Sequence, residues 1–301
     1  MISNTALGLI SGLFAAFMQS SSYLGGRRFL SCHGNANQLL TASMVICGIA
    51  ACLLLPFVGH WEKLLSWKMF GYLLICNGGF LAGQWGFFCA QKHIESSRIA
   101  SLLGLKIIVV VFLSLTVLGE RFTLLQYIAV AVAALAGMLM NWSSGKLNWN
   151  GMGYLLVALI GYAVSDTVIQ LVVTEVHAEN PIVGGLCGYA FNYLLSGLLG
   201  LLALRHFKVN MKMLAGAVPQ AVCWTLSMWG LYVCFGLVGA AFGNVIQASR
   251  GVISLLLGIV LSYFAINGLE QKQSTAVWMR KAAAAILMFG AIVVYALTAK
   301  G

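Results

Sequence analysis

Residues 98–118 read Arg-Ile-Ala-Ser-Leu-Leu-Gly-Leu-Lys-Ile-Ile-Val-Val-Val-Phe-Leu-Ser-Leu-Thr-Val-Leu, an apolar run with one lysine, Lys106, near its middle. A helix of about 20 mostly apolar residues is long enough to cross the hydrocarbon core of a bilayer. Ten such runs occur in the chain, at 4–24, 37–58, 67–90, 98–118, 122–142, 151–174, 181–204, 211–235, 240–264 and 278–298. The sequence therefore predicts an all-α membrane protein with ten transmembrane helices and no soluble domain.

The composition indicates the same class of protein. Hydrophobic residues make up 61% of the chain, charged residues 8%, and the mean hydropathy is +0.94, whereas a soluble domain has about 25% charged residues. The net charge of +10 comes from basic residues scattered over short loops, with no basic cluster among aromatic residues. We expect these residues to orient the chain and to contact lipid headgroups, with no nucleic acid partner. We place the protein in a bacterial inner membrane as a multi-pass protein.

Motifs for a metal, a cofactor or ATP are not apparent in the sequence. Most of the 8 cysteines fall in apolar segments, where cysteine behaves as a small hydrophobic residue, and the 5 histidines lie in or beside loops. Neither a CxxC motif nor a Cys/His ligand spacing occurs, and there is no Walker motif. We therefore expect a protein that uses neither a cofactor nor ATP. We also expect it to be a monomer.

The chain divides into two related halves. The polar stretch 143–150 separates two groups of five predicted spans, which gives domains at residues 1–146 and 147–301. An odd number of spans in each half turns the second copy upside down, so the halves would form an inverted repeat of two five-helix domains. Inverted repeats are typical of secondary transporters, whose binding site lies between the repeats near the bilayer midplane.

Three matches between the halves share almost the same register. Residues 8–22 align with residues 153–167 at an offset of 145. At an offset of 144, two further residues of the first half have counterparts in the second: Trp85 aligns with Trp229, and Lys106 aligns with Arg250. The repeat therefore predicts that Lys106 and Arg250 occupy equivalent places.

Three charged side chains fall deep inside the predicted spans: Lys106, Asp166 and Arg250. A charge near the middle of a bilayer costs from about 2.5 to above 10 kcal/mol, so each needs a compensating role. A polar cavity that handles a charged solute is the best general reason. Two cations and one carboxylate leave a charge of +1, which suits an anion, or a zwitterion whose carboxylate meets the cations.

Lys106 and Asp166 have more than one possible role. Lys106 either contacts the solute or forms a structural ion pair with Asp166, and the two roles are compatible. Asp166 is the only aspartate in the chain. It could neutralise a cation, bind a solute amine, or take up a proton as a coupling site.

Arg250 belongs to a polar stripe on its predicted helix. Gly243, Gln247, Arg250 and Ser254 share one face, with Asn244 at its edge. A guanidinium binds carboxylate or phosphate bidentately, which favours solute binding. Hydrogen bonding between helices is the alternative role for this set.

Further candidates for the lining of the cavity are polar or aromatic residues inside the spans. Tyr162 and Gln170 share a helix face with Asp166. The indoles related by the repeat could stack on an organic solute or pack in the core. The remaining candidates are Asn77, Gln84, Trp85 and Trp229.

The chain resembles a known family over essentially its whole length, most strongly in the first half. The run Ser101-Leu-Leu-Gly-Leu-Lys-Ile-Ile, then Leu118-Gly-Glu-Arg-Phe-Thr123, Gln126 and Gly137, is similar to the end of an EamA domain of the drug/metabolite transporter superfamily. This resemblance implies two tandem EamA-like domains in a ten-helix protein. It implies a secondary transporter of small metabolites such as amino acids, and related branches carry sugar phosphates.

The leading hypothesis is a secondary transporter that moves a small anionic or zwitterionic metabolite, an amino acid or organic anion, by alternating access. An exchanger of sugar phosphates or nucleotide-type metabolites is a variant of it. An intramembrane enzyme acting on a lipid-linked substrate is disfavoured, because one aspartate and no buried histidine supply no acid/base pair. A channel or receptor is the third class, and the charged centre of an inverted repeat argues against a simple pore.

The orientation in the membrane has two conflicting indicators. With both termini inside, the cytoplasmic side carries Lys63, Lys68, Arg121 and Lys300. The opposite side then carries Arg27, Arg28, Lys92, Arg98, Lys146, Arg205, Lys208, Lys212, Lys272, Arg280 and Lys281. The positive-inside rule therefore favours both termini outside, whereas the family resemblance implies both inside.

Overall fold

The structure, a computed structural model, describes residues 4–33, 35–64, 66–94, 99, 102–141, 149–176, 178–263 and 275–298, and the regular elements in these ranges are helices. They are α1 (Asn4–His33), α2 (Ala36–Val58), α3 (Trp61–Leu64), α4 (Trp67–Gln91), the 3₁₀ turn η1 (Leu103–Leu105), α6 (Lys106–Leu113), the π-helical η2 (Ser114–Leu118), α7 (Leu124–Asn141), α8 (Trp149–Val176), α9 (Pro181–His206), α10 (Met211–Gln247), α11 (Arg250–Tyr263) and α12 (Thr275–Thr298).

The helices suit a membrane environment by their length and composition. Six of those described are long and apolar enough to cross a bilayer: α1, α2, α4, α8, α9 and α10. Shorter apolar helical stretches cover Leu103–Leu118, Leu124–Leu139 and Ala282–Thr298. The predicted all-helical membrane fold is confirmed, while the count of ten spans stays a prediction.

Asparagine caps fix the start of three helices. The side chains of Asn35, Asn180 and Asn210 accept hydrogen bonds from backbone N–H groups at the starts of α2, α9 and α10, at 3.0, 2.9 and 3.0 Å. Such caps satisfy donors that have no partner inside the helix. Asn35 and Asn180 are 145 residues apart, the offset that aligns 8–22 with 153–167. The sequence therefore begins α2 and α9 at matching positions.

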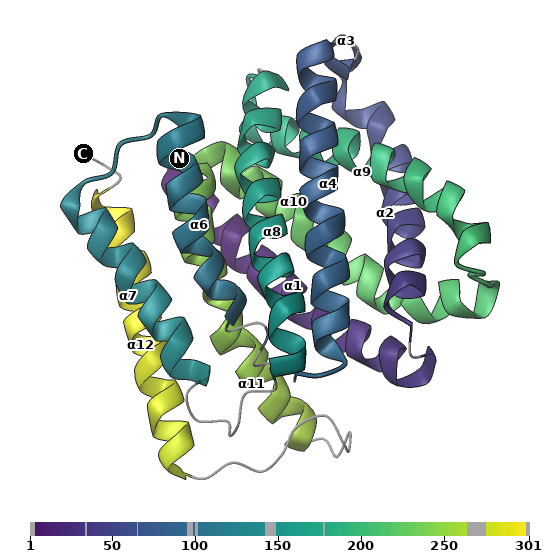
Figure 1. Cartoon of the computed structure of the whole chain (residues 1–301). Helices are drawn as coiled ribbons and strands as arrows, with labels where there is room; N and C mark the ends of the chain where they lie inside the picture. Colours follow the sequence, from purple (N-terminus) through teal and green to yellow (C-terminus); the bar gives the residue numbers. More distant parts are fainter. Residues whose placement is uncertain are drawn as a thin grey trace.

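The two halves are interleaved. The main helix pairs are α1 with α10, α4 with α8, α2 with α9, and α7 with α12, and each pair joins one helix from before residue 142 to one from after residue 148. Figure 1 shows this arrangement, with α1 beginning and α12 ending at the same end of the bundle. Small residues permit the closest crossing, because a Cβ added at Gly48 of α2 would lie only 2.4 Å from the Cα of Gly197 of α9.

Two helix breaks lie beside the buried cations. The 3₁₀ turn η1 ends where α6 begins at Lys106, and a turn at residues 248–249 separates α10 from α11, which begins at Arg250. A Cβ added at Gly104 would lie 3.8 Å from the Cβ of Ala248, so the two breaks face each other. The continuous helix predicted over 240–264 is therefore wrong, and the polar stripe through Arg250 is split between two helices.

A third irregularity lies inside α10. Gly239 has φ 81° and ψ 162°, a backbone conformation that is essentially restricted to glycine. α10 therefore bends at Gly239, where the sequence predicted a short connection between the runs 211–235 and 240–264. The bend redirects the chain toward Arg250.

Candidate functional site

A small cavity of about 10 Å³, with room for roughly one water molecule, lies between the two halves of the chain. Its polar wall consists of Gln19, Lys106, Ser165, Asp166 and Asn192. Aromatic residues form most of the remaining wall: Phe80, Tyr162, Tyr193, Trp224 and Tyr232. The lining comes from α1, α4, α6, α8, α9 and α10, so the cavity depends on the interleaving of the halves.

An ion pair between the halves crosses this cavity. The Nζ atom of Lys106 donates a hydrogen bond to Oδ2 of Asp166, and the residues are only 3% and 5% exposed. Lys106 projects from the first residue of α6, directly after the 3₁₀ turn, and Asp166 projects from the middle of α8. The Lys106 ammonium also lies 5.7 Å from the centre of the Tyr162 ring, within cation–π range. The structural pairing considered from the sequence is therefore present.

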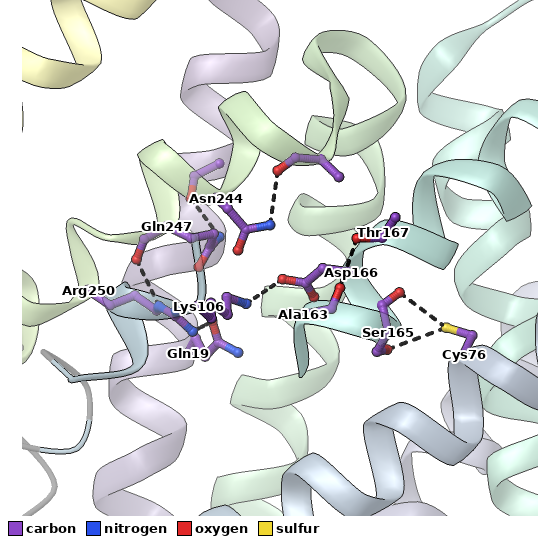
Figure 2. Close-up of polar contacts among 12 residues, drawn as sticks. Gln19, Cys76, Lys106, Ala163, Ser165, Asp166, Thr167, Asn244, Gln247 and Arg250 are labelled. Atoms are coloured by element: carbon purple, nitrogen blue, oxygen red, sulfur yellow. Dashed lines mark hydrogen bonds and ion pairs between the residues drawn. The ribbon is translucent and has the colours of Figure 1, made fainter. Parts of the chain in front are cut away.

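Arg250 is buried beside this pair, but its partners are neutral. Its Nε donates to the backbone oxygen of Gln247 at 2.8 Å. Its Nη1 donates to Oε1 of Gln19 at 2.7 Å and to the hydroxyl of Tyr23 at 3.1 Å. Because Gln19 also lines the cavity, it connects the guanidinium to the cavity wall (Figure 2).

The amides of the broken helix lie close to Arg250 in the sequence. Nδ2 of Asn244 donates to the backbone oxygen of Ala240 at 2.9 Å, and Nε2 of Gln247 donates to that of Gly12 at 3.2 Å. Their side-chain oxygens are buried and have no hydrogen-bond partner among the residues that the structure describes. Figure 2 shows both side chains on the same side of the Lys106–Asp166 pair as Arg250.

Two further predicted residues lie behind the cavity wall. Gln84 accepts a hydrogen bond from the hydroxyl of Tyr162, and so orients that ring toward the ion pair. Asn77 donates to Oδ1 of Asn192 at 2.7 Å and accepts from Ser196, which ties α4 to α9. Both Gln84 and Asn77 therefore support lining residues and do not themselves line the cavity described.

Gln170 lies away from the cavity, contrary to its predicted position beside Asp166. Its Nε2 donates to Glu120 at 2.8 Å, and its Oε1 accepts from the backbone N–H of Ala240 at 2.6 Å. Gln170 thus connects the loop after η2 to the chain just beyond the bend at Gly239. It caps an N–H group that the bend leaves without a helical partner.

The two tryptophans related by the repeat do not line this cavity. Trp85 is 38% exposed and packs edge-on against Tyr154 on the outside of the α4–α8 pair. Trp229 packs edge-on against Tyr189, with ring centres 6.0 Å apart. Both indoles pack against aromatic side chains, which agrees with the packing alternative, and a contact of either indole with a solute stays a prediction.

Several lining residues had no prediction from the sequence. Gln19 precedes the serine run 20–22, which the repeat aligned with residues 165–167, and this alignment was a usable signal. Trp224 and Tyr193 form a buried pair, with the indole Nε1 donating to the Tyr193 hydroxyl at 2.7 Å. Nothing in the sequence distinguished these two aromatic residues from ordinary core residues.

Comparisons with known proteins agree with the fold. A protein of Sinorhizobium sp described as an uncharacterized transporter in the cobO 3'region is 27% identical over 134 residues, which is 44% of this chain and 92% of that protein. A crystal structure of a protein has a TM-score of 0.70 at 15% identity and covers 97% of each chain, so it shares the fold. The family model of EamA-like transporters matches residues 6–142. The family model and the Sinorhizobium protein point to a membrane transporter rather than an enzyme, and residues 6–142 are similar to the EamA-like transporter family.

Proposed function

We propose that the protein is a secondary transporter that binds a small zwitterionic or anionic metabolite, an amino acid or organic anion, at the Lys106–Asp166 pair. The observation that carries the proposal is a buried ion pair that joins the two halves and lines the small cavity between them. A buried pair is weak evidence for stability, because its desolvation offsets most of the attraction. Charged residues within membrane spans more often mark a solute pathway.

The chemistry of the cavity fits a zwitterion with an organic side chain. A solute carboxylate would bind the Lys106 ammonium, and a solute amine would bind the Asp166 carboxylate. Each of the two side chains would then exchange its ion-pair partner in the protein for a charged group of the solute. The rings of Tyr162, Trp224 and Tyr232 would pack against the body of the solute. An organic anion would use Lys106 alone and leave Asp166 to take up a proton.

Alternating access would follow from two five-helix domains, residues 1–146 and 147–301, arranged as ten spans in an inverted repeat. The helix pairing supports this proposal, because the α1–α10 pair becomes the α8–α4 pair when the halves are exchanged. The facing breaks before Lys106 and Arg250 support it as well, since broken helices at the repeat interface are typical binding sites. We propose that the protein acts as a monomer in the bacterial inner membrane.

Counterflow in proteoliposomes tests the transporter proposal. Vesicles loaded with one unlabelled amino acid, organic acid or sugar phosphate are diluted into trace amounts of the same labelled compound. A carrier accumulates label transiently and saturates, whereas a channel only equilibrates. Saturable, trans-stimulated uptake of a zwitterion or anion is the expected result, and uptake that is linear and insensitive to the trans solute would contradict the proposal.

A further inference from the structure

The charges buried in the described core do not cancel. The buried charged side chains in that part of the chain are Lys106, Asp166 and Arg250. Asp166 pairs with Lys106, whereas the hydrogen bonds of Arg250 go to a backbone oxygen, an amide and a phenol. A guanidinium does not lose its proton in a protein, so its charge persists when it is buried. One positive charge therefore remains without a counter-ion among the described residues.

The guanidinium also has an unused donor group. Arg250 is 1% exposed, and its buried Nη2 atom has no hydrogen-bond partner in the described part of the chain. Nε and Nη1 are already occupied, so a ligand would bind end-on at Nη2. Buried polar groups are almost always satisfied, and an unsatisfied one commonly marks a water molecule or an ion.

Several unsatisfied polar atoms belong to residues that neighbour this arginine in the sequence. Within residues 244–254, buried side-chain atoms without a partner are Asn244 Oδ1, Gln247 Oε1, Ser249 Oγ, Arg250 Nη2 and Ser254 Oγ. The two serine hydroxyls can donate to an anion, and the two amide oxygens can hold the water molecules that accompany it. The break between α10 and α11 therefore collects both kinds of group that a hydrated anion requires.

We propose that Arg250 Nη2, beside the break between α10 and α11, binds one monovalent anion, either a halide or a carboxylate. The charge selects a monovalent ligand, since a single positive charge is left over and a divalent phosphate would leave an excess negative charge in a medium of low dielectric. This site is distinct from the Lys106–Asp166 pair, and its existence does not depend on solute binding there. The anion comes either from the surrounding salt or from the carboxylate group of a solute.

Thermal unfolding of the purified protein in detergent tests this site. Sodium sulfate, whose divalent anion does not match the single positive charge, is replaced stepwise by sodium chloride or by sodium acetate at constant ionic strength. An apparent Kd is taken from the concentration dependence of Tm. Stabilisation by either anion, with an affinity at least about 10-fold weaker in Arg250→Gln, is the expected result. The matched control is Arg121→Gln, which removes an exposed arginine in the loop after η2 and should leave the affinity unchanged.

The outcomes separate the two sources of the anion. Stabilisation by chloride assigns the site to an inorganic ion, and stabilisation by acetate alone assigns it to the carboxylate of a solute. If Arg250→Gln does not fold, Arg250→Lys is used, which keeps the charge and loses Nη2, and the affinity should again fall. Equal stabilisation of the parent and the Arg250 variant, or no effect of either anion on the parent, would overturn the proposal. Counterflow that fails while the anion effect persists would refute only the transporter proposal.

Discussion

Lys106 and Arg250 lie at matching positions of the two halves, yet their charges are compensated differently. Lys106 has a carboxylate partner in Asp166, and Arg250 has neutral acceptors from α1 and from the end of α10. Lysine carries a compact charge on a flexible chain, so it can exchange one partner for another, whereas the planar guanidinium of arginine holds several partners at once. This difference favours Lys106 as the mobile contact for a solute.

Removing one partner of the buried ion pair should destabilise the protein. Asp166→Asn leaves the Lys106 ammonium buried without a counter-ion, which costs roughly 3–5 kcal/mol when the cation stays charged. We expect a clear fall in Tm in detergent. Glu62→Gln is the control, because Glu62 is exposed and pairs only at 3.8 Å with His60. An Asp166→Asn protein with the Tm of the parent would show that the pair contributes nothing to stability.

The residue types inside the spans predicted the three charges but not their partners. Burial cost alone marks Lys106, Asp166 and Arg250, and the repeat relates two of them. Which acceptor each cation finds depends on the rotation of α1 and α8 about their axes, and an apolar span without an amphipathic pattern does not fix that rotation. The same reason explains why the sequence did not place Trp85, which lies inside a span but is 38% exposed.

At the scale of elements, the functional features are interruptions of helices. The 3₁₀ turn η1, the bend at Gly239 and the turn at residues 248–249 all lie near the cavity or its polar surroundings. The predicted runs 37–58 and 181–204 begin within one residue of α2 and α9, whose first residues follow the caps Asn35 and Asn180. The breaks at η1 and at residues 248–249 lie inside predicted apolar runs and were not predicted. No proline marks them, and glycine is common in membrane helices for packing reasons.

Replacing Gly239 should lower the stability of the protein, because any other residue would be strained in the backbone conformation found there. An alanine would have to adopt φ 81° and ψ 162°, a strain of about 1–3 kcal/mol. The added Cβ would also lie 3.5 Å from Oε1 of Glu120, beside the Gln170 contact that fastens the bend. We therefore expect Gly239→Ala to lower Tm and to slow solute exchange.

A helical glycine provides the comparison for this substitution. Gly78 in α4 is exposed, and a Cβ there would meet no atom within 4 Å, so Gly78→Ala should be neutral or slightly stabilising. Both variants are measured by thermal unfolding and by counterflow. If Gly239→Ala behaves like Gly78→Ala in both assays, the bend has no mechanical role.

At the scale of the whole molecule, the pairing of helices across the halves defines the architecture. Each main pair takes one helix from either side of residues 142–148, so neither half buries its apolar faces alone. The sequence offsets of 144 and 145 predict an inverted repeat, which stays a prediction, and they did not predict that the halves interleave. The halves interleave because helices approach closely at small residues such as Gly48 and Gly197. These contacts are visible only in the folded structure.

Membrane topology gives a direct prediction at this scale. Five spans in each half require both termini to lie on one side of the membrane and residue 146 to lie on the other. Reporters active only in the cytoplasm, fused before Met1, after Lys146 and after Gly301, should give the same signal at both termini and the opposite signal at Lys146. Opposite signals from the two termini, or equal signals at all three positions, would contradict the ten-span inverted repeat.

The central claim is that the Lys106–Asp166 pair binds solute and is more than a structural contact. The most direct measurement is counterflow by the double variant Lys106→Met/Asp166→Leu. Replacing both members of a buried ion pair by apolar residues is often neutral or stabilising, so this protein should fold with a Tm near that of the parent. The account predicts a folded protein whose saturable exchange is reduced by about 100-fold or more, since each charge is expected to contribute over 1.4 kcal/mol to solute binding. A folded double variant that exchanges solute with the affinity of the parent would contradict it.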